Sequence, residues 1–196
     1  ALMEGDLDKF DRNFWAHVGH LTRNKCRTIL LGLTRGHLHR ASAGGLRGKY
    51  ERKLAWSSAK FAYMADIALA LYGASVKRRE TINGRFGDIL SYMLMAVCTL
   101  KRFEAEGARP EDKACAQWVL QYCMAKTNVA LIGLLENMHP VFKYLFAPLA
   151  RINPIAIMPS DRLGQKLAMQ LLENDEFRNN LTDGVHMPKD ANDHMN

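Results

Sequence analysis

Residues 84–104 read Gly-Arg-Phe-Gly-Asp-Ile-Leu-Ser-Tyr-Met-Leu-Met-Ala-Val-Cys-Thr-Leu-Lys-Arg-Phe-Glu, and this stretch decides the fold. Large apolar residues recur along it every three or four positions, which is the period of an amphipathic α-helix. Gly107, just beyond it, is a residue typical of a helix C-terminus. The predicted buried stripe of this helix contains Phe86, Ile89, Leu90, Met93, Val97, Leu100 and Phe103.

The same spacing extends outward in both directions. On the N-terminal side a stripe of mostly apolar residues predicts a second long helix, and on the C-terminal side Pro110 is a good start for a third. The stripe before the central helix contains Tyr50, Leu54, Ser57, Phe61, Met64, Ala68 and Leu71. The stripe after it contains Trp118, Tyr122, Ala125, Val129, Ile132 and Gly133.

Two shorter helices are predicted before these three. The first runs through Phe10 and Val18 and is capped by Asp6 or Asp8; the second is capped by Thr22 or Asn24 and ends before residue 36. No segment shows the strict alternation typical of a strand. The sequence therefore predicts an all-α protein, an antiparallel bundle of about five to seven helices joined by short connections.

Residues 138–159 differ in composition from the preceding helices, because four prolines interrupt a run of large apolar residues. Ser160-Asp161 then predicts the N-cap of a further helix. We expect a helical domain over 1–181, including this proline-broken segment, and a polar, frayed tail over 182–196. The prolines exclude a transmembrane helix over 138–159, because they would leave backbone groups unsatisfied in hydrocarbon.

Two interpretations of residues 138–159 remain open. The apolar side chains fold back onto the bundle as core, or some of them enter a membrane interface while neighbouring cations meet lipid phosphates. The candidate membrane or interface residues are Phe142, Lys143, Tyr144, Leu145, Phe146, Arg151, Ile155, Ile157 and Met158.

Positive charge is concentrated in the first third of the chain. The formal net charge is +7, and residues 1–60 carry all of it, with 12 Lys and Arg against 5 Asp and Glu. Such a sector can face nucleic acid, anionic lipid or an acidic neighbouring domain. No helix-turn-helix, basic zipper or aromatic stacking motif accompanies it, so nucleic acid is not an expected partner. The candidate basic docking face contains Arg23, Lys25, Arg27, Arg47, Lys49 and Arg52.

Motifs for catalysis or metal binding are weak. The four cysteines form no Cys-x-x-Cys pair, and the histidine pairs His17/His20 and His37/His39 lack the further ligands that zinc requires. The glycine-rich stretch from 44 to 48 lacks the strand-before, helix-after context of a phosphate loop. We therefore expect no catalytic, metal-binding or cofactor-binding residue on this chain.

Several blocks of sequence, in order, resemble the C-terminal helical extension of bacterial FadE-type long-chain acyl-coenzyme A dehydrogenases. The central blocks are residues 77–80 (Lys-Arg-Arg-Glu), 87–90 (Gly-Asp-Ile-Leu) and 100–107 (Leu-Lys-Arg-Phe-Glu-Ala-Glu-Gly). Residues 10–20 and 24–36 resemble its opening, and residues 159–163 (Pro-Ser-Asp-Arg-Leu) resemble a later landmark.

The resemblance implies part of a flavoenzyme of fatty-acid β-oxidation, which converts long-chain acyl-coenzyme A to the trans-2-enoyl thioester. In such enzymes the glutamate base and the FAD site belong to an upstream dehydrogenase core, so this chain is expected to be inactive alone and to carry no FAD. Its implied partner is the core of the same polypeptide.

Mitochondrial very-long-chain relatives also carry a helical C-terminal domain, linked to dimer formation and inner-membrane association. By that analogy we expect a homodimer in the bacterial cytoplasm with peripheral contact at the inner membrane. A stand-alone helical module that binds a membrane or a partner is the alternative.

Overall fold

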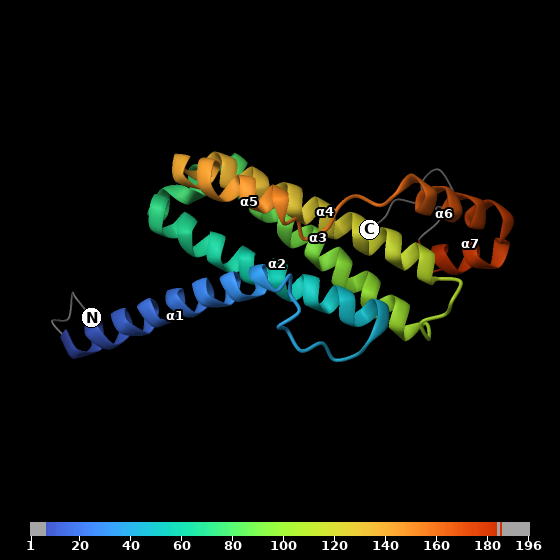
Figure 1. The fold of residues 1–196 in the computed structure, drawn as a ribbon, viewed down its shortest axis with the longest axis horizontal. Helices are drawn as coiled ribbons and strands as arrows, with labels where there is room; N and C mark the ends of the chain where they lie inside the picture. The colour runs from blue at the N-terminus through green and yellow to red at the C-terminus, as the bar shows by residue number, and fades with distance from the viewer. Residues whose placement is uncertain (1–6, 184, 186–196) are drawn as a thin grey trace, which may run out of the picture.

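The computed structural model describes residues 7–183 and 185, and every regular element in that part of the chain is a helix. The predicted all-α bundle of five to seven helices is confirmed (Figure 1). The candidate cap Asp6 and most of the predicted tail lie outside the described residues. The helices are α1 Leu7–Leu33, α2 Gly45–Tyr72, α3 Glu80–Ala105, α4 Lys113–Met138, α5 Ala147–Ile152, α6 Asp161–Glu173 and α7 Asp175–Thr182.

Helices α3 and α4 form the most extensive pair, and α2 packs against both. A 3₁₀ helix, Gly73–Arg78, joins α2 to α3, and a π-helical turn, Phe142–Phe146, leads from α4 into α5. Helix α5 lies at one end of the bundle, and α6 and α7 lie at the other (Figure 1).

The core is formed where α2, α3 and α4 meet. Trp56 of α2, Ile89 of α3 and Leu120 of α4 are each at most 1% exposed. They belong to one contiguous cluster, which also includes Ile155 from the segment after α5. The core is thus contributed by the chain's own helices, and the long apolar stripes provide its hydrophobic stabilisation.

Local sequence signals set several helix ends. Gly107, at φ 85°, follows the end of α3 in the left-handed region that favours glycine. Ser160 caps α6 by accepting a hydrogen bond from the Leu163 amide, and Asn174 caps α7 in the same way. The predicted stop at Gly107 and the predicted cap at Ser160 are both confirmed.

The prediction of two short N-terminal helices is wrong, because α1 is continuous over 27 residues. The two candidate caps make other hydrogen bonds. Thr22 Oγ1 donates to the Val18 carbonyl one turn back, and Asn24 Nδ2 donates to Asp66 of α2. Bonding to the i−4 carbonyl lets threonine sit inside a helix without ending it.

The predicted buried stripes are only partly right. On α3, Ile89 and Leu100 are buried, but Leu90 is 56% exposed. On α4, Val129 is 62% exposed, whereas Met124 and Leu134 are fully buried. Helix α4 contacts α2, α3, α5 and α6, so its buried surface is far wider than one stripe.

Helix α4 is the one helix in the described part of the chain whose length and composition would suit a membrane span. Half of the relevant window is buried inside the bundle. Burial on several faces accounts for this hydrophobicity without a membrane, because a helix that is apolar all round is typical of a core.

Replacing Leu134 with alanine should lower the free energy of unfolding by about 2–5 kcal/mol, because the site is fully enclosed and leaves a cavity. Val129→Ala is the matched control on the same helix, and it should change stability by less than about 0.5 kcal/mol. Urea unfolding followed by circular dichroism measures both. Equal losses in the two variants would contradict the orientation of α4.

Candidate binding groove

Helix α1 is the least packed long element of the bundle. Among the described helices it contacts α2 alone, and Leu31 is its one buried residue. Its N-terminal part projects beyond the rest of the bundle (Figure 1). Hydrogen bonds hold its C-terminal half: Thr28 Oγ1 donates to the Ala59 carbonyl of α2 at 3.0 Å, and Asn153 Nδ2 donates to the Gly32 carbonyl at 3.0 Å.

The incomplete packing of α1 leaves an open groove of about 460 Å³ between α1, α2, α4 and the π turn with α5. Its volume lies in the range of small-molecule sites. Phe142 and Phe146, whose ring centroids are 5.5 Å apart, line one wall. The other apolar lining residues include Ile29, Leu33, Met64, Leu131, Leu135, Leu149 and Ile152.

The lining also includes the polar residues Lys25, Thr28, Tyr63 and Asn153, and two further polar groups, those of Trp56 and Lys60, lie against each other. Trp56 is 1% exposed, and its indole nitrogen has no hydrogen-bond partner among the described residues. The Lys60 ammonium lies 4.3 Å from the centre of the Trp56 ring. Burial lowers the pKa of Lys60 to about 8. Trp56 and Lys60 are four residues apart on α2, so they lie on the same helix face.

Lys53, one helical turn before Trp56 on α2, has a hydrogen-bond partner within the fold. Its ammonium donates a hydrogen bond to the Ile155 carbonyl, and the Ile155 amide donates to Asn128 of α4 at 3.1 Å. Burial lowers the pKa of Lys53 to about 8, and the nearby Lys49 and Arg35 lower it further. Lys53 therefore attaches the segment after α5 to the bundle.

The structure divides the predicted interface residues among four environments. Ile155 is 1% exposed and belongs to the core, while Phe142 and Phe146 line the groove. Arg151 pairs with Glu136 of α4. The remaining five face outward: Lys143, Tyr144, Leu145, Ile157 and Met158.

The predicted basic docking face is spread over α1 and the start of α2. Arg47 is not free for a partner, because its Nε lies 2.7 Å from Glu51 and 2.9 Å from Glu104 of α3. The hydrogen bond from Arg47, followed by that from Ser42, lowers the pKa of Glu51 to about 2. Exposed cations of this candidate face are Arg23, Lys25 and Arg27 on α1 and Lys49 on α2.

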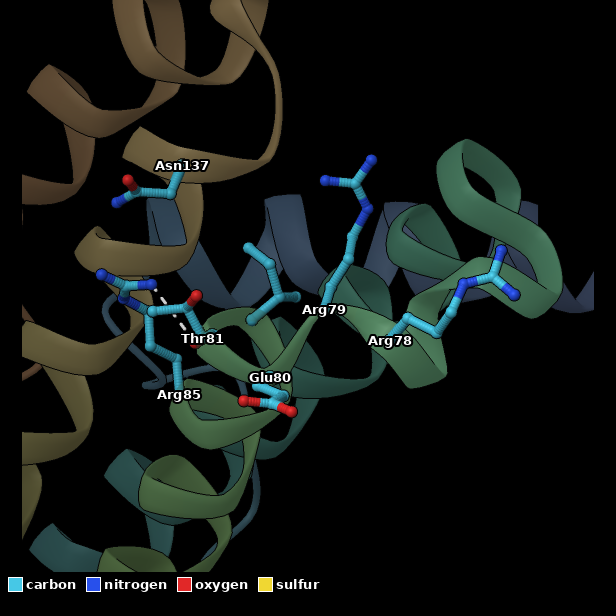
Figure 2. A pocket seen from close by; sticks show the side chains of 7 residues that line it. Arg78, Arg79, Glu80, Thr81, Arg85 and Asn137 are labelled. Atoms are coloured by element: carbon cyan, nitrogen blue, oxygen red, sulfur yellow. Dashed lines mark hydrogen bonds between the residues drawn. The ribbon is translucent and has the colours of Figure 1, made fainter.

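A second hollow, of about 420 Å³, lies at the start of α3 and is rich in arginine. Figure 2 shows the guanidinium groups of Arg78, Arg79 and Arg85 pointing in different directions. Arg79 stacks over the Tyr72 ring at 3.9 Å, and Arg85 donates to the Thr81 carbonyl at 3.2 Å. The three cations do not converge on one point, so this hollow offers no built anion site.

The glycine-rich stretch, residues 44–48, does not fit the pyrophosphate of a flavin dinucleotide. A Cβ on Gly48 would lie 2.0 Å from the Ala43 carbonyl oxygen, so the glycine-rich stretch packs against its own backbone and leaves no cradle for a pyrophosphate. Within the described part of the chain no three His, Cys, Asp or Glu side chains are grouped as metal ligands would be.

Sequence reasoning did not select the groove or its two polar groups. Lys60 appeared only as one more cation, and Trp56 was not assigned to any stripe. The available signal was the i, i+4 spacing of a tryptophan and a lysine next to a row of small residues on α2. That signal does not reveal that a groove between α1, α2 and α4 opens beside these two residues.

Comparison with known proteins gives one family. The model described as acyl-CoA dehydrogenase, C-terminal, bacterial type, matches residues 1–196. No solved structure was found to match the chain.

The buried Lys60 ammonium should make stability depend on pH. Its pKa falls from 10.5 to about 8 on folding, so its burial costs stability at neutral pH, and the cost disappears as pH rises from about 8 to 10.5. We expect the stability of wild type relative to Lys60→Met to increase over that interval. Urea unfolding of both proteins at several pH values measures it. A difference independent of pH would contradict the burial of this ammonium.

Proposed function

The chain belongs to the family of bacterial-type acyl-CoA dehydrogenase C-terminal domains, and from this premise we propose that it is a non-catalytic domain that docks onto the dehydrogenase core of the same polypeptide. Membership in an acyl-CoA dehydrogenase family implies FAD in the parent enzyme. The resemblance to FadE-type extensions supports a long-chain acyl-coenzyme A substrate and a place in fatty-acid β-oxidation.

The observation that carries the proposal is the apolar surface of α1. Phe14 is 48% exposed and Trp15 is 66% exposed, and Phe10, Phe14 and Trp15 form a contiguous aromatic cluster. Aromatic side chains are enriched where proteins associate, and a contiguous apolar patch marks an interaction surface. A helix of 27 residues with one helical neighbour has most of its length available to a partner.

The preferred occupant of this surface is the dehydrogenase core. A C-terminal domain follows its core along the chain, so α1 is the described helix nearest to the core in sequence. Covalent linkage also raises the effective concentration of the core above that of any separate partner.

The segment around α5 supports peripheral membrane contact as a second role. Tyr144, Leu145, Leu149 and Ile152 are each at least 57% exposed, and Lys143 lies beside them. Aromatic and aliphatic side chains beside a cation are typical of a surface that lies in a membrane interface. We therefore propose that the enzyme works in the bacterial cytoplasm, in peripheral contact with the inner membrane.

In the complete enzyme, Phe14→Asp should release α1 from the core. Burying a phenylalanine contributes about 1.5–3 kcal/mol, so amide exchange in α1 should become at least about tenfold faster. Hydrogen–deuterium exchange with mass spectrometry measures this. Asn13→Asp, the adjacent exposed residue with the same new charge, is the control and should leave exchange unchanged.

Two results would contradict core docking. In one, α1 exchanges equally fast in the complete enzyme and in the 196-residue chain. In the other, α1 of the 196-residue chain becomes protected as its concentration rises, which would assign the surface to a second copy and support the homodimer.

For the membrane role, Leu145→Asp combined with Leu149→Asp should reduce co-sedimentation of the complete enzyme with vesicles containing anionic lipid. The two side chains are four residues apart, and each is 57% exposed, so neither substitution disturbs the core. Leu172→Asp, at a leucine of α6 that is 75% exposed, is the control. Unchanged sedimentation of the double variant would exclude this segment as the contact.

A further inference from the structure

The groove beside α1 contains hydrogen-bond donors that no described residue satisfies. The indole N–H of Trp56 is buried without an acceptor, although buried donors are almost always paired. The ammonium of Lys60 has a ring face beside it but no carboxylate in an ion pair among the described residues. Leaving such groups unpaired costs free energy, so an acceptor that reaches both would be strongly favoured.

The charge of the groove indicates what kind of acceptor fits. Its lining residues include two lysines, Lys25 and Lys60, and no aspartate or glutamate. Lys53 differs from Lys60, because the Lys53 ammonium donates a hydrogen bond to the Ile155 carbonyl and thereby stabilises the fold. Lys60 is therefore available to a negatively charged group from outside the bundle.

The rest of the lining favours a ligand with a long apolar part. Most of the remaining lining is aliphatic or aromatic, from Leu131 and Leu135 of α4 to Phe146 of the π turn and Leu149 of α5, with Thr28, Tyr63 and Asn153 as further polar residues. An apolar pocket with a few convergent polar groups is the usual form of a small-molecule site. Gly32 of α1 adds no side chain over the indole: a Cβ there would lie 3.8 Å from Trp56 Nε1.

We infer that this groove binds a fatty carboxylate, with the carboxylate accepting hydrogen bonds from Lys60 and Trp56 and the alkyl chain lying against α4 and α5. The ligand is held without covalent chemistry. The site lies within one chain, and the α1 residues that line it, from Lys25 to Leu33, come after the aromatic cluster of Phe10, Phe14 and Trp15 through which α1 is proposed to dock. It gives the domain a ligand of its own, separate from the thioester that the dehydrogenase core would oxidise.

The test uses sodium dodecanoate as the probe and the 196-residue chain, whose core comes from its own helices. Equilibrium dialysis below the micellar concentration measures affinity. Proton–nitrogen spectra resolve the indole N–H groups of the three tryptophans. The Trp56 resonance, assigned with Trp56→Phe, should shift saturably, while that of Trp118, which stacks on Tyr122 outside the groove, should not.

The variants separate the charge from the apolar lining. Lys60→Met should weaken dodecanoate binding about tenfold or more, because a charge-assisted hydrogen bond is lost while the groove stays apolar. Trp56→Phe should weaken it severalfold, because only a neutral donor is lost. Lys126→Met is the matched control, since Lys126 lies over the Tyr122 ring at 5.4 Å outside the groove, and it should bind as wild type does.

Three results would overturn the inference. One is equal binding of dodecanol, which would show that no carboxylate is recognised. The second is wild-type affinity in Lys60→Met. The third is loss of dodecanoate binding in the complete enzyme with its acyl-CoA site saturated, which would assign the groove to a segment of the core. Retained binding there, together with a shifted Trp56 resonance in the isolated chain, supports it.

Discussion

The burial of α4 on several faces at once is the constraint on which the other helices depend. Helix α3 covers one side of it, α2 another, and α5 and α6 occupy its two ends. Leu120, Met124 and Leu134 are fully buried as a result. A helix this apolar cannot remain exposed in water, so the bundle assembles around it, and the amphipathic helices supply one face each.

Helix α1 has a different relation to the bundle. It is long and carries aromatic side chains, yet α2 is its one helical neighbour in the described structure. Side-chain hydrogen bonds such as Asn24 to Asp66 fix its direction, while little apolar burial holds it. A helix attached in this way leaves both a projecting surface and a groove. The projecting surface suits a protein partner, and the groove suits a smaller apolar ligand.

The two buried lysines of α2 show how burial alone fails to identify a functional group. Lys53 and Lys60 both have a pKa lowered to about 8 by burial. Lys53 donates a hydrogen bond to the Ile155 carbonyl and holds the segment after α5, and this hydrogen bond offsets the free-energy cost of burying its ammonium. Lys60 has only the Trp56 ring and an open groove beside it. The two lysines differ in their partners. The partner of Lys53 is the carbonyl of Ile155, about 100 residues away in the sequence, whereas no described residue forms an ion pair with Lys60.

The sequence by itself determined the all-α class, the long helices α2, α3 and α4, several helix ends and the family. The helical period of the apolar residues, the helix end at Gly107 and the cap at Ser160 are local signals, so they can be recognised without knowing which segments pack nearby. The ordered blocks between 77 and 107 identify the family. The tertiary structure decided which stripes are buried, that Thr22 bonds backward inside one continuous helix, and that a groove between α1, α2 and α4 opens beside Trp56 and Lys60. Periodicity shows which residues share a helix face; how many helices cover that face depends on contacts between distant segments. For this reason Val129 fits the pattern of a core residue yet faces outward, while Lys60, an ordinary surface cation in the sequence, lies in a groove.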